Sequence, residues 1–278
     1  MYGYGYRYNS GLVVSAGGGG GGSFLLDTYP NAKVGYSLRQ LSASATNCVR
    51  VRRSSDNAEQ DIGFASGIVD SASILTFASG STAVVTKWYD QSINGNDASI
   101  PTAVYQPTIA SGGVIKVSTY NGQPAIFFDG VRGRLHLLNG ITTTQEYYQS
   151  AVFDRPIINK YSITLGNHST QIPTPFLWHT LNRIYSAMPS FVLHDTGYTQ
   201  TGDFLVTTLR DTSNDIKFWI NGVQGTTGNL AGVGDTLNSI QSQGFHNGAY
   251  QELIYWGETQ EANQTDIESD TNNFYSIY

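Results

Sequence analysis

The stretch VRVRRSSDNAEQDIGF, residues 49–64, has the pattern of a β-hairpin. VRVRR alternates apolar and basic residues as a strand does, SSDN is typical of a turn, and QDIGF has the pattern of the return strand. The stretch is also the densest run of charge in a chain of which only 13% is charged, with Arg50, Arg52, Arg53, Asp56, Glu59 and Asp61. Such a cluster could be an active site. Cross-strand charge pairs also stabilise a hairpin by a few tenths to about 1 kcal/mol, so we interpret the cluster as structural.

Strand-like runs rich in β-branched and aromatic residues recur along the rest of the chain. They are Val49–Arg53, Ala83–Tyr89, Val114–Val117, Ala125–Phe128, Phe204–Leu209, Ile216–Ile220 and Tyr250–Trp256. The dipeptide Asn-Gly supplies the positive φ angles of tight hairpin turns. It occurs five times, beginning at Asn94, Asn121, Asn139, Asn221 and Asn247. Many short strands separated by turns predict an all-β sandwich or jelly roll.

Three segments have helical spacing instead. AKVGYSLRQLS (32–42) places Val34, Leu38 and Leu41 on one helical face, and SASILTFAS (71–79) is long enough for a turn or two. The last segment, ETQEANQTDIESDTNNFYSIY (258–278), has acidic residues early, where the helix dipole favours them. We therefore expect a few short helices and a C-terminal helix.

The composition limits the class of partner. The chain has 278 residues, 40% of them hydrophobic, and a net charge of −6, which argues against nucleic acid because such binders need a basic surface. Cys48 is the single cysteine, so no internal disulfide can form, and we expect it to be buried. The apolar runs are far short of the roughly 20 residues that span a bilayer, and the first residues do not resemble a secretory signal.

Residues 1–23, MYGYGYRYNSGLVVSAGGGGGGS, differ from all that follows. The run of six glycines predicts a flexible tether, because glycine has no side chain to pack and a high ordering cost. The tail could be simply disordered. We favour an anchoring arm in which Tyr2, Tyr4, Tyr6 and Tyr8 lie in a groove of another subunit, followed by one globular domain over residues 24–278.

The segment KWYDQSINGNDAS, residues 87–99, is the best candidate for a binding site. Asp90, Ser92 and Asn94 stand at alternate positions before a glycine, as at the start of a calcium loop, although Pro101 occupies the position of the bidentate glutamate. The alternative is a polar turn tied by its own Asp and Asn side chains. For carbohydrate, the candidates are aromatic faces beside polar groups: Trp88, Tyr89, Asp90, Asn94, Asn96 and, further along the chain, Trp178.

Hydrolytic chemistry on sugars needs two carboxylates, about 5 Å apart in retaining enzymes and about 6.5–9.5 Å apart in inverting ones. Spacing along the chain does not give such a distance. Glu252 is a single acid on an expected strand. Phosphate-loop, esterase and zinc-site motifs are absent from the sequence.

Several of these segments also carry a family resemblance. GYSLRQLSAS, VRVRRSSDNAEQDIGF, VVTKWYDQSINGNDAS, YQPTI and GQPAIFFDG, with the C-terminal YQELIYWGETQEANQTDIESDTNNFYSIY, resemble concanavalin A-like lectin/glucanase domains of phage and bacterial surface proteins. Their order also resembles the early part of the arabinofuranosidase B catalytic domain. The resemblance covers about residues 25–130 and 245–278, and it implies a concanavalin A-like jelly-roll sandwich.

The function implied by this resemblance is that of a non-enzymatic phage virion protein, such as a head fibre, decoration protein, spike or tail adhesin. The arm would dock on other virion proteins, and the domain would hold cell-surface or environmental glycans on the virion surface after lysis, as a homo-oligomer that raises weak affinity through many copies. Two alternatives stay open. One is a glycoside hydrolase of arabinofuranosidase type, and the other is a purely architectural capsid or tail component.

The resemblance to arabinofuranosidase B also implies an active site with two adjacent cysteines shortly before a catalytic glutamate. This chain has Cys48 alone and no matching glutamate segment, so no catalytic residue carries over. The sequence therefore predicts no enzyme, no certain cofactor and, at most, Ca²⁺ at the Asp90 turn.

Overall fold

The computed structural model describes residues 24–130, 133–155, 162–163, 165–167, 177–178, 183–187, 191–195, 201–225, 227–229, 236–240 and 247–278. These residues form mostly antiparallel β-structure with a few short helices, so the all-β fold class is confirmed. The predicted arm, residues 1–23 with Tyr2, Tyr4, Tyr6 and Tyr8, lies outside the described residues. Within the described part of the chain, no helix has the length and apolarity needed to cross a membrane.

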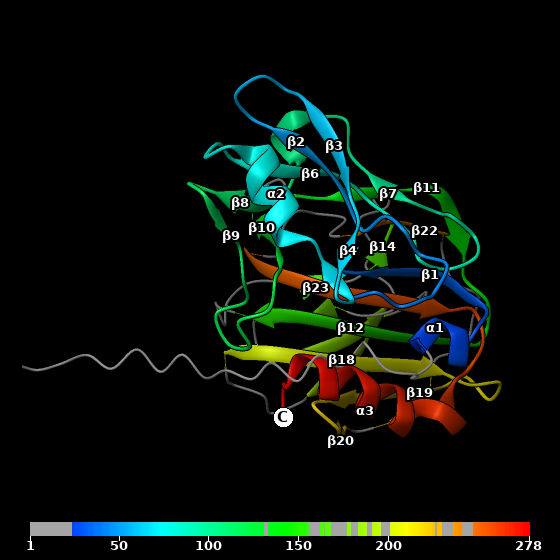
Figure 1. Cartoon of the computed structure of the whole chain (residues 1–278). Helices are drawn as coiled ribbons and strands as arrows, with labels where there is room; N and C mark the ends of the chain where they lie inside the picture. Colours follow the sequence, from blue (N-terminus) through cyan, green and yellow to red (C-terminus); the bar gives the residue numbers. More distant parts are fainter. Residues whose placement is uncertain are drawn as a thin grey trace, which may run out of the picture.

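The elements follow one another in short pieces (Figure 1). The helices are α1 (Leu25–Thr28), α2 (Ser71–Ala78), η1 (Ala103–Tyr105), η2 (Glu261–Asn263) and α3 (Gln264–Tyr275). The first strands are β1 (Ala32–Ser37), β2 (Val49–Arg53), β3 (Glu59–Ile62), β4 (Phe64–Ala65), β5 (Ile68–Val69), β6 (Ala83–Trp88), β7 (Ala98–Ser99), β8 (Thr108–Ser111), β9 (Val114–Ile115), β10 (Ile126–Asp129), β11 (Leu135–Thr142) and β12 (Tyr147–Arg155). The later strands are β13 (Ser162–Ile163), β14 (Leu165–Gly166), β15 (Leu177–Trp178), β16 (Arg183–Ala187), β17 (Phe191–Asp195), β18 (Gly202–Arg210), β19 (Asp215–Ile220), β20 (Val223–Gln224), β21 (Gly228–Asn229), β22 (Thr236–Ile240) and β23 (Asn247–Trp256).

The long strands pair side by side around β23. β23 pairs with β12 along one edge and with β1 and β10 along the other, and β12 continues the sheet to β18 and β19. β19 alternates buried and partly exposed residues, as a strand with one face toward a core does. β23 is buried at nearly every position because the sheet is covered on both faces.

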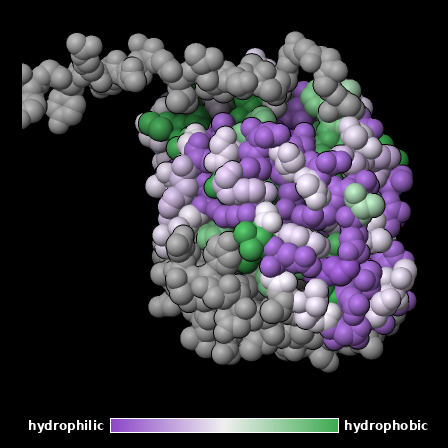
Figure 2. Space-filling view, turned by 90° about the horizontal axis from the view of Figure 1, so that it is seen from below, coloured by the Kyte–Doolittle hydropathy of each residue, from purple (hydrophilic) through white to green (hydrophobic). Residues whose placement is uncertain are grey.

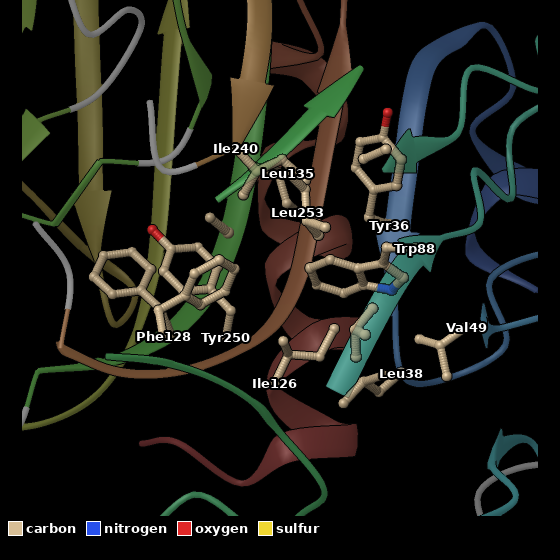
Figure 3. Packing of buried hydrophobic residues seen from close by; sticks show 14 of the residues in the cluster. Tyr36, Leu38, Val49, Trp88, Ile126, Phe128, Leu135, Ile240, Tyr250 and Leu253 are labelled. Carbon is tan, nitrogen blue, oxygen red and sulfur yellow. The ribbon is translucent and has the colours of Figure 1, made fainter. Parts of the chain in front are cut away.

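The main core lies on the face of this sheet away from α3. Buried residues of β1, β2, β6, β11 and β23 join in one cluster. Its aromatic rings pack closely: Tyr250 stacks on Phe153 at 5.3 Å between ring centres and meets Phe128 edge-on at 5.6 Å. Trp88 packs beside Tyr36 and Leu38 in the same cluster (Figure 3). Each such side chain contributes on the order of 2 kcal/mol when it is removed from water.

Helix α3 covers the opposite face of the sheet, beneath β18 and β19 in Figure 1. Ile267 packs against Tyr148 and Ile254, and Tyr275 packs against Leu205. The outward side of α3 is polar, and the face of the molecule on this side is mainly hydrophilic, with apolar residues in small separate areas (Figure 2). The amphipathic pattern of the C-terminal segment thus predicted a helix correctly.

A buried ion pair fixes α3 to the sheet. Arg39 donates from Nε and Nη2 to the two carboxylate oxygens of Glu252 on β23, at 2.7 and 3.1 Å, and from Nη1 to Asp270 on α3 at 2.6 Å. The side chain of Glu252 is completely buried. Glu252, the single strand acid noted in the sequence, therefore has a structural partner.

The charged stretch that begins at Val49 is the predicted hairpin. β2 and β3 pair antiparallel, with Arg50 opposite Asp61 and Arg52 opposite Glu59. Arg50 binds both carboxylate oxygens of Asp61, at 2.6 and 2.7 Å, and both side chains are more than one-third exposed. The structural interpretation of this charge is confirmed.

Two local predictions were wrong. The segment 32–42 was expected to be a helix, but its first half is strand β1. Val34 and Tyr36 are buried on one face of this strand and Ser37 on the other, and such two-sided burial imitates helical spacing. Of the Asn-Gly pairs, Asn221 and Gly222 do form a turn with positive φ, whereas those beginning at Asn139 and Asn247 lie within β11 and β23, because strand pairing overrides the local preference.

Candidate active site

The predicted sugar platform Trp88 has no exposed surface. It is the last residue of β6 and packs 5.9 Å from the ring centre of Tyr36, inside the main core. The side chain of Trp88 therefore presents no face to a ligand in this structure, and its assignment to a sugar site is corrected. Trp178 lies in β15, and the placement of its side chain lies outside what the structure describes.

The carboxylate of Asp90 is occupied by the protein itself. One oxygen accepts hydrogen bonds from the backbone of Gly35 and Ser92, at 2.8 and 2.9 Å, and the other accepts from the backbone of Asn96 at 2.8 Å and the hydroxyl of Ser92 at 2.7 Å. The amide of Asn94 donates to the carbonyl of Ala32 at 2.8 Å. This is the polar turn that the sequence left open as the alternative to a calcium loop.

Tyr89 and Asn96 also serve the scaffold around that turn. The hydroxyl of Tyr89 donates to Asp61 at 2.7 Å, and the amide of Asn96 donates to the carbonyl of Asn139 at 2.9 Å. The described residues contain no cluster of three or more His, Cys, Asp or Glu side chains that could hold a metal ion. Binding of carbohydrate or Ca²⁺ at this segment stays a prediction.

Cys48 is completely buried, as expected for a lone cysteine. Burial raises its pKa well above the usual value, and its thiol lies 3.4 Å from the carbonyl oxygen of Ser37. A thiol without a stabilised thiolate is a poor nucleophile, so Cys48 is a packing residue.

The structure brings together two acids that the sequence did not single out, Asp154 and Asp203. Asp154 is near the end of β12 and Asp203 is near the start of β18, and the two are direct partners in the antiparallel register. Directly opposed residues of such a pair have Cβ atoms about 4.5–5.5 Å apart. Their exposed fractions are 1% and 7%, so two buried acids lie side by side on the same face of the sheet, at one of its ends.

The two carboxyl groups have different hydrogen-bond donors. Oδ1 of Asp154 accepts from the backbone of Ala249 on β23 at 2.6 Å. Oδ1 of Asp203 accepts from the hydroxyl of Ser118 at 2.5 Å, and the backbone of Asn121 also donates to the Asp203 carboxylate. Among the described residues, Oδ2 of Asp203 is buried without a hydrogen-bond partner.

These surroundings act differently on the pKa values of the two acids. Burial is the main cause that raises the pKa of Asp154 to about 7, and the nearby Asp203 raises it further. Burial also raises the pKa of Asp203, while the bonds from Ser118 and Asn121 act in the opposite direction because they stabilise the charged form. Asp203 is thus the member that ionises first, and Asp154 is the member that holds a proton near neutral pH.

Asp203 also lines a pocket of about 240 Å³. The other lining residues are Tyr120, Thr201, Gly202, Phe204, Asn221, Ser276 and Ile277, which come from the turn after β9, from β18, from the turn after β19 and from the end of α3. An aromatic ring, an amide, hydroxyls and a carboxylate around a small cavity suit a polyhydroxylated ligand of the size of one sugar ring. Pockets with perturbed acids are candidate active sites.

Comparisons with known proteins give one family match and several similar folds. Residues 34–125 match the family described as "Alpha-L-arabinofuranosidase B, catalytic". Curated proteins give no match. Among solved structures, a GH54 α-L-arabinofuranosidase soaked with a cyclic sulfate inhibitor matches with a TM-score of 0.59 and 16% identity, over 89% of this chain and 63% of that chain.

Two further structures give the same picture. An arabinofuranosidase complexed with arabinofuranosyl-α-1,2-xylobiose and a mutant GH54 enzyme soaked with 4-nitrophenyl α-L-arabinofuranoside each match with a TM-score of 0.61 and 16% identity. Each match covers 89% of this chain, which spans 63% of the length of those structures. At this identity the likeness concerns the fold.

These matches correct the family and function expected from the sequence. The family that matches is an arabinofuranosidase catalytic domain and not a concanavalin A-like lectin family of phage surface proteins. The expectation of a phage virion protein was based on that resemblance, and the expectation of no enzymatic activity was based on the missing cysteine pair and glutamate segment. The matches contradict both expectations. The predicted partners and location stay predictions.

The acid pair was missed because Asp154 and Asp203 are far apart in the sequence. A weak signal exists: each is the single acid of a strand rich in uncharged residues, YYQSAVFDR and GDFLVTTLR, in which an arginine at the end is the other charged residue. An acid on a buried strand needs a partner or a function, because burying an unpaired charge is costly.

Proposed function

We propose that this chain is a glycoside hydrolase of arabinofuranosidase type, which removes arabinofuranosyl groups from polysaccharides or glycosides. The observation that carries the proposal is the pair of neighbouring acids, Asp154 and Asp203, one of which lines a sugar-sized pocket. The match of residues 34–125 to an arabinofuranosidase catalytic domain supports the substrate class. The likeness of fold to arabinofuranosidases over 89% of the chain supports it further.

The spacing of the two acids favours a retaining reaction. The Cβ atoms of directly opposed residues in an antiparallel pair lie about 4.5–5.5 Å apart, which allows the carboxyl separation of roughly 5 Å that is typical of retaining glycosidases. Asp203 would attack the anomeric carbon, while the bond to the leaving oxygen breaks and that oxygen takes a proton from Asp154. Water would then cleave the glycosyl ester with Asp154 as the base, which restores both groups.

Burial assigns the two roles and sets one requirement. Asp203, which receives hydrogen bonds from Ser118 and Asn121, is suited to the charged nucleophile. Asp154, with a pKa raised to about 7, is suited to the acid. Because Asp154 is only 1% exposed, its proton must reach the leaving oxygen by rotation of the carboxyl group toward the pocket or through one water molecule.

We further propose that residues 24–278 form one jelly-roll β-sandwich domain. The antiparallel sheet around β23 and the strands β2, β6 and β11 bury one shared core, as the two layers of a sandwich do. The GH54 structures of similar fold support this architecture.

The test is an activity assay on the purified chain. The substrates are 4-nitrophenyl α-L-arabinofuranoside and an arabinose-substituted xylan, with 4-nitrophenyl β-D-xylopyranoside as the matched control for sugar specificity. Release of nitrophenol and arabinose, with the α-anomer as the first product in NMR, is the expected result. An absence of release from both arabinosides at all pH values between 4 and 8 would contradict the proposal.

A further inference from the structure

The turn Ser118–Gln123 lies next to the acid pair, where the hydroxyl of Ser118 contacts Asp203. The backbone N–H of Ser118 donates to the carbonyl of Gln123 at 2.9 Å, and the N–H of Gly122 donates back to the carbonyl of Ser118 at 3.0 Å. The side chains of Asn121 and Gln251 exchange two hydrogen bonds, at 2.7 and 3.1 Å, which attach the turn to β23. The turn Ser118–Gln123 is therefore held in one position relative to the sheet.

The hydroxyl of Ser118 donates a hydrogen bond from this turn to Asp203. Its side chain is 1% exposed, and its oxygen lies 3.3 Å from the backbone N–H of Tyr120, which donates to it. Since the oxygen accepts that bond, its own proton is free to point at Oδ1 of Asp203, 2.5 Å away. With Oδ1 fixed, Oδ2 of Asp203 is the oxygen without a hydrogen bond within the described residues.

We propose that Ser118 is a positioning residue of the acid pair: its hydroxyl holds Oδ1 of Asp203, so that Oδ2 is the oxygen without a hydrogen bond among the described residues, and it keeps Asp203 the charged member of the pair. The proposal rests on the proposed function and names a group that the hydrolytic mechanism itself does not require. A bond from a hydroxyl to a buried carboxylate stabilises the charged form and not the neutral acid. The hydroxyl of Ser118, which is not one of the two acids, would thus determine which acid is the nucleophile and which is the proton donor.

Among the groups around Asp203, the hydroxyl of Ser118 has the largest lowering effect on its pKa. Asp154 on β12 is the neighbouring acid, and Tyr120 is the titratable residue of the turn. The end of α3 contributes Ser276 and Ile277, which carry no charge. The causes that shift the pKa of Asp203 are burial, which raises it, and the hydrogen bonds from Ser118 and Asn121, which lower it.

The experiment measures the titration of the two acids directly, by NMR on protein labelled with ¹³C at the aspartate carboxyls. Comparison with D203N and D154N assigns the two signals. In the wild-type protein Asp203 should titrate at lower pH than Asp154. In the Ser118→Ala variant the midpoint of Asp203 should rise by about 1–2 pH units, since hydrogen bonds to charged groups are of that strength.

The matched control is Ser42→Ala. Ser42 is also buried, at 6% exposed, and also donates to a carboxylate, Asp27, at 2.8 Å, but outside the pocket. It should leave the midpoint of Asp203 unchanged. Ser118→Cys, which keeps the size of the side chain with a weaker donor, gives an intermediate shift and serves if Ser118→Ala does not fold.

Two results would overturn the proposal: a midpoint of Asp203 that is the same in wild type and both Ser118 variants, or a wild-type protein in which Asp154 titrates first. In an active enzyme, the acid limb of the profile of kcat/KM against pH should move with the midpoint of Asp203. If the wild-type chain hydrolyses no arabinoside, the proposed function fails, yet the NMR titration still decides the role of Ser118.

Discussion

Asp154 and Asp203 are direct register partners on β12 and β18, and each accepts hydrogen bonds from a different part of the chain. Ala249 on β23 donates to Asp154, while the turn Ser118–Gln123 supplies Asp203. Four segments that are distant in the sequence thus meet at one end of the sheet. The consequence is a pair of like acids with unlike proton affinities, beside a pocket that one of them lines.

The first prediction concerns stability against pH. The pKa of Asp154 is raised to about 7 in the folded chain, against about 3.9 in an unfolded one. The folded state therefore binds this proton more tightly, and the resulting stability is complete below about pH 4 and is lost as the pH rises through about 7. Urea unfolding should therefore show that the unfolding free energy of the wild type falls by about 3 kcal/mol between pH 5 and pH 8 because of this group.

The variant Asp154→Asn isolates that contribution, because its amide does not titrate. The difference in unfolding free energy between wild type and Asp154→Asn should change by this amount across the same pH range. Parallel stability curves for the two proteins would show that Asp154 titrates normally and would refute the assignment.

The second prediction compares two arginines that each bind both oxygens of one carboxylate. Arg39→Ala leaves Glu252 buried without its cation, and it should lower the unfolding free energy by about 3–5 kcal/mol. Arg50→Ala breaks an exposed pair with Asp61 and should cost less than about 1 kcal/mol. Urea unfolding at pH 7 measures both, and similar losses in the two variants would contradict the structural role given to Arg39.

The third prediction compares two glycines with positive φ. A Cβ at Gly130 would lie 2.6 Å from Cβ of Asn247, at the pairing of β10 with β23, whereas a Cβ at Gly95 would meet nothing within 4 Å. Both alanine variants carry the same left-handed strain of about 1–2 kcal/mol. Gly130→Ala should lose a further 1–3 kcal/mol, roughly, from the clash, as read by thermal unfolding, and equal losses would be inconsistent with this contact.

The sequence allowed the scaffold to be predicted well where local patterns decide it. The hairpin of β2 and β3 carries its alternation and its turn within a few residues, and α3 carries its own amphipathic pattern. β1 was predicted wrongly because burial on both faces removes the alternation that distinguishes a strand from a helix. Asn247 and Gly248, at the start of β23, were taken as a turn because a dipeptide does not show which strands lie beside it.

The candidate site could not be predicted because its two acids become neighbours only through the register in which β12 pairs with β18. Asp154 and Asp203 become neighbours through nine consecutive residue pairs between β12 and β18, of which the sequence gives no sign. The alternating polar residues beside two aromatic residues directed attention to residues 87–99, whose polar groups the structure shows bonded to one another and to the backbone. Exposed polar residues near aromatic residues are common, whereas a buried acid on a strand is rarer and was the better signal.

The most direct measurement of the central claim is the hydrolysis of 4-nitrophenyl α-L-arabinofuranoside by wild type, Asp203→Asn and Glu59→Gln. Glu59 is an exposed acid on β3, so its variant controls for a loss of charge elsewhere. If the acid pair is the active site, Asp203→Asn should lower kcat/KM by roughly a thousandfold or more, while Glu59→Gln keeps the wild-type value. If Asp203→Asn folds normally and hydrolyses the arabinoside as fast as the wild type, Asp203 is not the nucleophile and the assignment of this site is wrong.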